Sequence, residues 1–379
     1  MIDIDSPDCI GCGACESVCP QNCIALKTDN EGFLYPVVDD KKCTDCHQCE
    51  NICIINNDIA PIEIREAYAV YSKNEKERLR SSSGAVFYEL SRKTIDGGGV
   101  VFGAAFSDDW SVTHTMCTSL DELHNLQTSK YVQSETSGIF EQVKSELHKE
   151  KTVLFCGTPC QCNALSLYLK KSYSNLLLVD FICHGVPSPG VWQKYVHSFG
   201  FTDIQKINFR NKSKSWENYC FSVCNNGKEY TQKYIKNPYM RLFLFDLILR
   251  KSCYRCKSKI PNKKSDITAA DLWGAEKIAS ELNDHKGLSM VVINSSKGAD
   301  FFEGILDSCI YKKIDITAAL SNNESSYKSV TIPECRNKVI EQIISSDSPD
   351  FDKIAKKNAT QPLPQRILAV LKSKFNINI

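Results

Sequence analysis

Eight cysteines near the start of the chain have the spacing of cluster ligands. The run DCIGCGACESVCPQNCI opens a CxxCxxCxxxC pattern, which recurs about 34 residues later. Three thiolates spaced in this way can bind three corners of a cubane, while the fourth cysteine binds the other cluster. The repeat therefore predicts two 4Fe-4S clusters. One set is Cys9, Cys12, Cys15 and Cys53, and the other is Cys43, Cys46, Cys49 and Cys19.

The same repeat argues against zinc, because zinc ribbons need no third cysteine at this spacing in both halves. Cys23 falls outside the repeat and is expected to be a packed thiol. We expect residues 1–58 to form an α+β, ferredoxin-like dicluster module whose clusters supply much of its folding energy. Such a module transfers single electrons, so the chemistry must lie further along the chain.

Composition limits the class of protein. The 379 residues include 46 Lys and Arg against 45 Asp and Glu, which leaves no basic field for nucleic acid. No export signal and no apolar run long enough to span a bilayer is found, so we expect a cytoplasmic protein without a transmembrane segment. In that setting, 20 cysteines indicate metal ligation or redox chemistry rather than disulfides.

The body of the chain alternates apolar strands with helices. Residues 65–73 read as a strand, 81–96 as a helix with a Ser- and Gly-rich start, and 97–106 as a buried strand. Residues 152–171 and 175–199 each add an apolar strand, a cysteine-bearing turn and a helix. This order predicts an α/β domain with a mainly parallel sheet, whose turns share one edge.

A further metal centre is expected at that edge. Cys160 and Cys183 follow neighbouring strands, and Cys253 and Cys256 form a CxxC pair. Four cysteines from three segments suit either a structural zinc ion or another cluster, and the spacing alone does not separate the two.

Nine motifs in this order resemble one family. They are SSSGAVFYEL, GGGVVFGAAF, TSKYVQSE, CGTPCQ, CHGVPSP, FRNKSKSW, CYRC, DITAADLWG and KGLSMVVINSSKG. Residues 1 to about 300 resemble the coenzyme F-420 hydrogenase/dehydrogenase beta-subunit family, in its bacterial branch with an N-terminal 4Fe-4S dicluster ferredoxin domain. The resemblance implies a third 4Fe-4S cluster on the four cysteines above. It also implies FAD bound near Ser82, Ser83, Gly84, Lys130 and Tyr131.

The expected function is therefore an FAD- and iron-sulfur-dependent oxidoreductase. A ferredoxin or redox partner subunit would exchange electrons with the clusters, and FAD would reduce or oxidise a small-molecule substrate. Bacterial relatives often accompany genes for surface polysaccharide synthesis, which points by association to a sugar-linked substrate. The alternatives are a non-enzymatic electron-transfer subunit of a larger complex and, less favoured, a thiol-disulfide reductase using Cys156 and Cys160.

Three side chains near this edge are candidates for binding or catalysis. His184 is expected to be a proton donor, against the alternative of a turn histidine bonded to backbone. Arg210 and Lys212 are expected either to bind an anionic substrate or the FAD pyrophosphate, or to be ordinary surface charges.

The expected division of the chain after the module has three parts. Residues 62–148 would form the flavin-binding part of the reductase domain, and 149–320 the part with the third metal centre. Residues 321–379 would be a polar linker and a C-terminal helix around RILAVLKSKF, docked on its own domain, a membrane surface or a partner.

Overall fold

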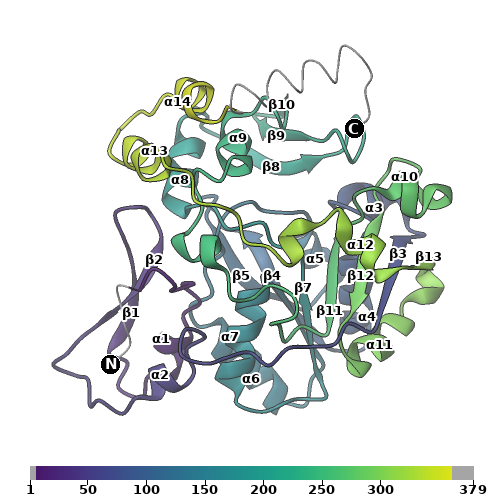
Figure 1. Ribbon diagram of the computed structural model, residues 1–379, viewed down its shortest axis with the longest axis horizontal. Helices are drawn as coiled ribbons and strands as arrows, with labels where there is room; N and C mark the ends of the chain where they lie inside the picture. The colour runs from purple at the N-terminus through teal and green to yellow at the C-terminus, as the bar shows by residue number, and fades with distance from the viewer. Residues whose placement is uncertain (1–5, 361–379) are drawn as a thin grey trace.

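The computed structural model describes residues 6–360, and its N-terminal module is a small α+β unit (Figure 1). The module contains α1 (Ala14–Val18), an antiparallel hairpin of β1 (Ile24–Thr28) and β2 (Leu34–Val38), and α2 (Gln48–Asn51). Its own apolar core is little more than Cys15, Cys23 and Ile24. A core of this size stabilises little by itself, which agrees with a module built around its cysteines.

The body is organised around one eight-stranded mixed sheet of order β13-β3-β12-β11-β7-β6-β4-β5. The four central strands are parallel, as expected, whereas the flanking strands β5, β12, β3 and β13 pair antiparallel. Strands from both expected parts of the reductase domain join this single sheet. The strands are β3 (Glu66–Ser72), β4 (Val100–Phe106), β5 (Val112–Cys117), β6 (Val153–Gly157), β7 (Leu176–Asp180), β11 (Ile267–Asp271), β12 (Ser289–Ile293) and β13 (Cys309–Ile314).

Helices cover both faces of this sheet (Figure 1). On β6, Val153 and Phe155 pack in one cluster with residues of α6 and α7, while Leu154 packs in another with α4 and α5. Burial on both faces explains the continuous apolar runs of the central strands. The helices are α3 (Glu75–Arg80), α4 (Val86–Asp96), α5 (Leu120–Leu126), α6 (Ile139–His148), α7 (Pro159–Leu169), α10 (Ala275–Ile278), α11 (Ser296–Glu303) and α12 (Ile316–Ser321).

A second, aromatic-rich unit stands beside the sheet and was not anticipated. It combines a three-stranded antiparallel sheet with four helices around buried Trp192, Tyr195, Phe209 and Tyr239. Its elements are α8 (Pro189–His197), β8 (Ile204–Asn211), β9 (Cys220–Asn225), β10 (Lys228–Lys233), α9 (Pro238–Leu244), α13 (Arg336–Ile344) and α14 (Phe351–Asn358).

The C-terminal region corrects one expectation. Instead of a polar linker after residue 320, α13 and α14 bury Val339, Ile343, Phe351 and Ile354 in the aromatic-rich unit. The expected helix at 366–375 lies outside the described residues. Between residues 6 and 360, no helix is both long and apolar enough to cross a lipid bilayer.

One ion pair ties the N-terminal module to α13. The Arg336 guanidinium, which is fully buried, donates to both carboxylate oxygens of Glu31 at 3.0 and 2.6 Å. Lys251 adds a third contact to Glu31 at 2.9 Å. Burial raises the pKa of the Glu31 carboxyl, but hydrogen bonds and charges from Arg336 and Lys251 outweigh it and lower the pKa overall. The contact therefore contributes stability above about pH 4.3, which is lost as the pH falls through the lowered pKa.

The first prediction concerns this ion pair. Replacing Glu31→Gln leaves the Arg336 charge buried without a carboxylate, which should destabilise the docked module by about 3 kcal/mol or more. Thermal unfolding should show a lower midpoint for the variant. The exposed pair between Lys286 and Glu75 is the control, because Glu75→Gln should change the midpoint little. Equal midpoints for the two variants would contradict the assigned role.

Candidate functional site

The N-terminal cysteines gather into two sets that cross between the repeats. Four cysteines line one cavity of about 20 Å³, formed between the hairpin and the 43–49 loop. They are Cys19, Cys43, Cys46 and Cys49. Cys23, which we expected to be a packed thiol outside the repeat, also lines this cavity. Its sulfur lies 3.3 Å from the sulfur of Cys19.

The other set centres on Cys15. Burial raises the pKa of the Cys15 thiol to about 12, and the charges of Cys9 and Cys53 act in the same direction. Cys12 interacts with the same neighbours. Both groups therefore match the crossed arrangement expected from the repeat.

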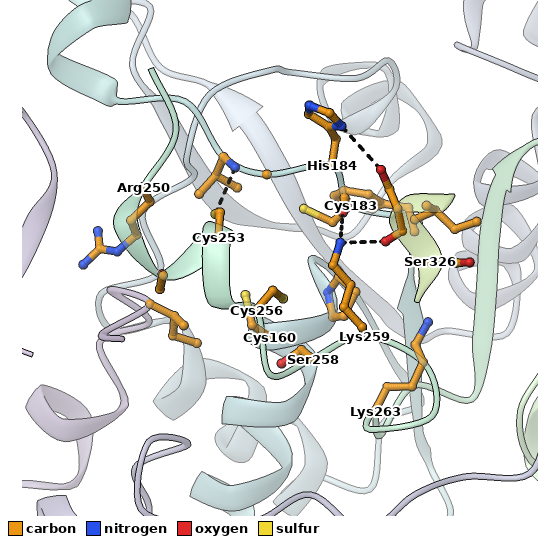
Figure 2. A pocket seen from close by; sticks show the side chains of 18 residues that line it. Cys160, Cys183, His184, Arg250, Cys253, Cys256, Ser258, Lys259, Lys263 and Ser326 are labelled. Atoms are coloured by element: carbon orange, nitrogen blue, oxygen red, sulfur yellow. Dashed lines mark hydrogen bonds between the residues drawn. The ribbon is translucent and has the colours of Figure 1, made fainter. Parts of the chain in front are cut away.

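A third group of cysteines meets at the edge of the large sheet (Figure 2). Cys160, Cys183, Cys253 and Cys256 all line a cavity of about 40 Å³. Cys160 lies in the first turn of α7, where Thr158 and Gln161 form a reciprocal capping box and Pro159 starts the helix. Cys183 follows β7, and the other two lie in and just after the 3-10 turn η1 (Lys251–Arg255).

Burial and mutual repulsion disfavour the thiolate forms of this third group of cysteines. Burial, and after it the charge of the neighbouring Cys256, raises the pKa of Cys160 to about 12. Burial likewise raises the pKa of Cys183, with Cys253 as the next cause. Iron ions bound to the sulfurs would offset this mutual repulsion, so the residues fit a thiolate-ligated cluster. Across residues 6–360, no three His, Cys, Asp or Glu side chains form a site for a single metal ion.

A larger cavity of about 560 Å³ adjoins the thiol cavity. Ser82, Ser83, Lys130 and Tyr131, all expected to bind FAD, lie in its wall. The cavity shares the 181–186 segment after β7 with the thiol cavity. A flavin held in the larger cavity would therefore lie next to the four cysteines.

The residues expected to hold FAD have distinct surroundings. Ser82 Oγ accepts hydrogen bonds from the Ser129 backbone at 2.8 Å and hydroxyl at 3.0 Å, and Ser83 Oγ donates to the Leu288 carbonyl at 2.9 Å. Gly84 packs against the Val70 carbonyl with no room for a side chain. Its requirement for glycine thus comes from close backbone packing rather than from the cavity.

The start of α4 contributes backbone groups to the cavity. Ala85 caps the helix with a left-handed φ of 67° and makes no side-chain cap bond. Ala85, Val86 and Phe87 all lie in the cavity wall. The serines before this helix are therefore not its cap, and its N-terminal N–H groups favour a negatively charged or electron-rich ligand.

Lys130 provides a buried amine in the same wall. Its Nζ donates to the Gln127 carbonyl at 3.0 Å, and burial lowers the pKa of the lysine to about 7. A ligand carrying negative charge would raise this pKa and favour the ammonium form.

His184 lies on both cavities and has a carboxylate partner. Its Nε2 is 2.6 Å from Asp246 Oδ1, and its Nδ1 is 3.4 Å from Ser325 Oγ. Both ring nitrogens therefore face side chains rather than backbone groups. No sequence pattern predicts the role of Asp246, which lies 62 residues further on and adopts a positive φ of 60°.

Arg210 and Lys212 differ in their roles. The Arg210 guanidinium is buried in the cavity wall, pairs with Asp271 at 2.9 Å and stacks on Tyr219 at 4.1 Å. Its Nε has no hydrogen-bond partner among residues 6–360. Lys212 Nζ instead donates to three backbone carbonyls at 2.8–2.9 Å, so it ties loops together rather than offering a free cation.

Cys156 also faces the large cavity. Burial raises the pKa of its thiol to about 12, with the Asp180 charge as a smaller cause. Thiol-disulfide exchange needs a thiolate, so this environment does not suit the reductase alternative.

Cysteine sets spaced for clusters, beside a large cavity on an α/β sheet, define an iron-sulfur redox protein. Comparisons with known families agree. Residues 8–57 match the 4Fe-4S dicluster domain, and residues 150–318 match the family described as the C terminus of the coenzyme F420 hydrogenase/dehydrogenase beta subunit. These two matches confirm the resemblance to the coenzyme F420 hydrogenase/dehydrogenase beta-subunit family that the sequence motifs indicated.

Two individual proteins are similar to this chain at low sequence identity. One subunit of the F(420)H(2) dehydrogenase of Methanosarcina mazei is 21% identical over 229 residues, which cover 55% of this chain and 63% of that protein. The chain thus spans less than two thirds of this curated relative. A chain of the F420-reducing NiFe hydrogenase complex from Methanosarcina barkeri is 14% identical, with a TM-score of 0.48, covering 77% of this chain and 96% of that one.

The crossed sets lead to the second prediction. Cys19→Ser combined with Cys46→Ser removes two ligands of one cluster and should lower the iron content by about four atoms per chain. Cys19→Ser combined with Cys12→Ser affects both clusters and should lower it by about eight. Iron analysis of anaerobically purified protein measures both. Cys117→Ser, a buried cysteine outside these sets, is the control, and equal losses in the two double variants would refute the crossed grouping.

Proposed function

We propose that this protein is an oxidoreductase in which a ferredoxin-type donor, three 4Fe-4S clusters and FAD serve a small-molecule substrate. The observation that carries the proposal is the segment 181–186, which lines both the four-cysteine cavity and the large cavity. When bound, FAD would supply the exchange between single electrons and electron pairs. Such an exchange is needed wherever clusters serve two-electron chemistry.

The position of the N-terminal module supports entry of electrons from that side. Ile10, next to Cys9, lines the four-cysteine cavity. Gln133 holds this loop by donating to the Ile10 carbonyl at 3.0 Å, and Thr136 donates to the Cys12 carbonyl at 2.9 Å. The Cys9 set is thus fixed beside the third cysteine group. The set around Cys46, which is itself exposed, would accept the ferredoxin or redox partner subunit.

The large cavity would hold the flavin and admit the substrate. Lys130 would offer positive charge to the FAD pyrophosphate or to an anionic substrate, and the start of α4 would offer backbone N–H groups. Arg210 is paired with Asp271, so it would contribute mainly its Nε–H as a hydrogen-bond donor. His184, oriented by Asp246, would hold a proton at Nδ1 or Nε2 for transfer at the boundary of the two cavities. A sugar-linked substrate remains our hypothesis from the association with polysaccharide genes.

The third prediction is the cofactor content. Protein purified without oxygen should contain about twelve iron atoms and one FAD per chain, with no zinc. Metal analysis and absorbance spectra of the released flavin measure this directly. Zinc in place of about four of the iron atoms would remove the third cluster, and an absent flavin would leave only an electron-transfer subunit.

A fourth prediction isolates the third cluster. Cys256→Ser should lower the iron content from about twelve to about eight atoms per chain, because one of four ligands is lost. Cys156→Ser should keep about twelve, since Cys156 lies on the large cavity and not on the four-cysteine cavity. Loss of iron from Cys156→Ser would instead show that Cys156 is a ligand.

A further inference from the structure

A buried arginine joins the N-terminal module to the four-cysteine cavity. Arg250 has no solvent exposure and lines that cavity (Figure 2). Its Nε donates to the Cys9 carbonyl at 2.7 Å, and its Nη2 donates to the Leu34 carbonyl at 2.9 Å. Its Nη1 donates to the Gln133 side-chain oxygen at 3.0 Å, and its guanidinium carbon lies 4.1 Å from the centre of the Tyr35 ring.

All of these partners are neutral. Among residues 6–360, no ion pair joins Arg250 to a carboxylate. Arg336 provides the contrast, because it is equally buried and also holds the module, but it pairs with the Glu31 carboxylate at 2.6 Å. A fully buried charge without an opposite charge is costly, so Arg250 calls for an anion that the amino-acid side chains do not supply.

A second cation of the same cavity, the half-buried Lys259, also lacks a carboxylate partner among the described residues. Lys259 Nζ donates to the carbonyls of Cys183 at 2.8 Å and Ser325 at 2.6 Å (Figure 2). Lys263, the neighbouring lysine of the same cavity, is instead neutralised by Asp180 at 2.8 Å.

We propose that Arg250 and Lys259 are the counter-charges of the anionic group held by Cys160, Cys183, Cys253 and Cys256. This inference rests on the proposed function, in which that group is a 4Fe-4S cluster. Arg250 also bonds the Cys9 carbonyl, so its charge acts on the cluster of the Cys9 set as well. Among residues 6–360, the hydrogen bonds of the Lys259 ammonium go to the Cys183 turn and the Ser325 loop, so its charge acts mainly on the third cluster.

The physical consequence is a raised reduction potential. Reduction adds negative charge, and a nearby cation stabilises the reduced state more than the oxidised state. Low dielectric strengthens this effect at a buried position. A cation that is paired with a carboxylate, such as Arg336 or Lys263, has a much weaker effect on the reduction potential of a cluster, because the two charges largely cancel. Arg250 and Lys259 would therefore keep the third cluster reducible by the cluster of the Cys9 set.

The test is an anaerobic redox titration of full-length protein followed by electron paramagnetic resonance. Arg250→Met should lower the midpoint potentials of the Cys9-set cluster and the third cluster, and Lys259→Met should lower only the third. We expect at least a tenfold change in each one-electron equilibrium, which is about 59 mV. Arg250→Lys and Lys259→Arg keep the charge and should shift the potentials less. Arg336→Met combined with Glu31→Gln removes both charges of a neutralised pair, and it should shift both potentials much less than Arg250→Met does.

The outcomes separate the two proposals. If wild-type protein shows only two clusters and about eight iron atoms, the proposed function fails. If three clusters are present and neither Met variant shifts a potential, or the charge-keeping variants shift it equally, the counter-charge proposal is overturned. If Arg250→Met loses iron, the Lys259→Met variant decides the question, because the two hydrogen bonds of the Lys259 ammonium within residues 6–360 go to Cys183 and Ser325 and not to the N-terminal module.

Discussion

The junction between the N-terminal module and the sheet domain depends on charged side chains that are removed from water. Arg250 donates to the Cys9 and Leu34 carbonyls of the module, and Arg336 pairs with Glu31. Both guanidinium groups are fully buried, so each must satisfy its donors within the protein. This requirement fixes the module in one position. Electron transfer between cofactors needs fixed neighbours, and the buried junction supplies that constraint.

The large sheet fixes the positions of two cysteines of the third group. Its central parallel strands end at one edge, where the turns after β6 and β7 place Cys160 and Cys183 on a common cavity. The same turn after β7 carries His184 into the larger cavity. A single short segment thus forms the boundary between a thiol-lined site and a site large enough for a flavin. This boundary explains why the cysteines and the candidate proton donor are adjacent in sequence.

Features set by local spacing were predictable. The CxxCxxCxxxC repeats predicted two crossed cysteine sets, and Cys19 does lie with the cysteines of the second repeat on one cavity. The alternating apolar runs identified the parallel centre of the sheet. The antiparallel flanks were not anticipated, because apolar strands buried on both faces look alike in either direction. Residues 336–358 were read as polar linker, although their few apolar residues fill an aromatic core contributed by α8 and α9. Because α8 and α9 lie far from residues 336–358 in the sequence, the local pattern did not reveal this packing.

The sequence by itself determined the chemistry, because cluster ligation depends on thiols at short, regular intervals along one segment. It also indicated that Cys160 and Cys183 would meet, since the ends of parallel strands share an edge. Only the tertiary structure decided the electrostatic surroundings. Asp246 beside His184, Lys212 on three carbonyls, and Arg250 between two cysteine sets all join segments far apart in the chain. These contacts result from tertiary packing, so they cannot be predicted from the spacing of residues along the chain.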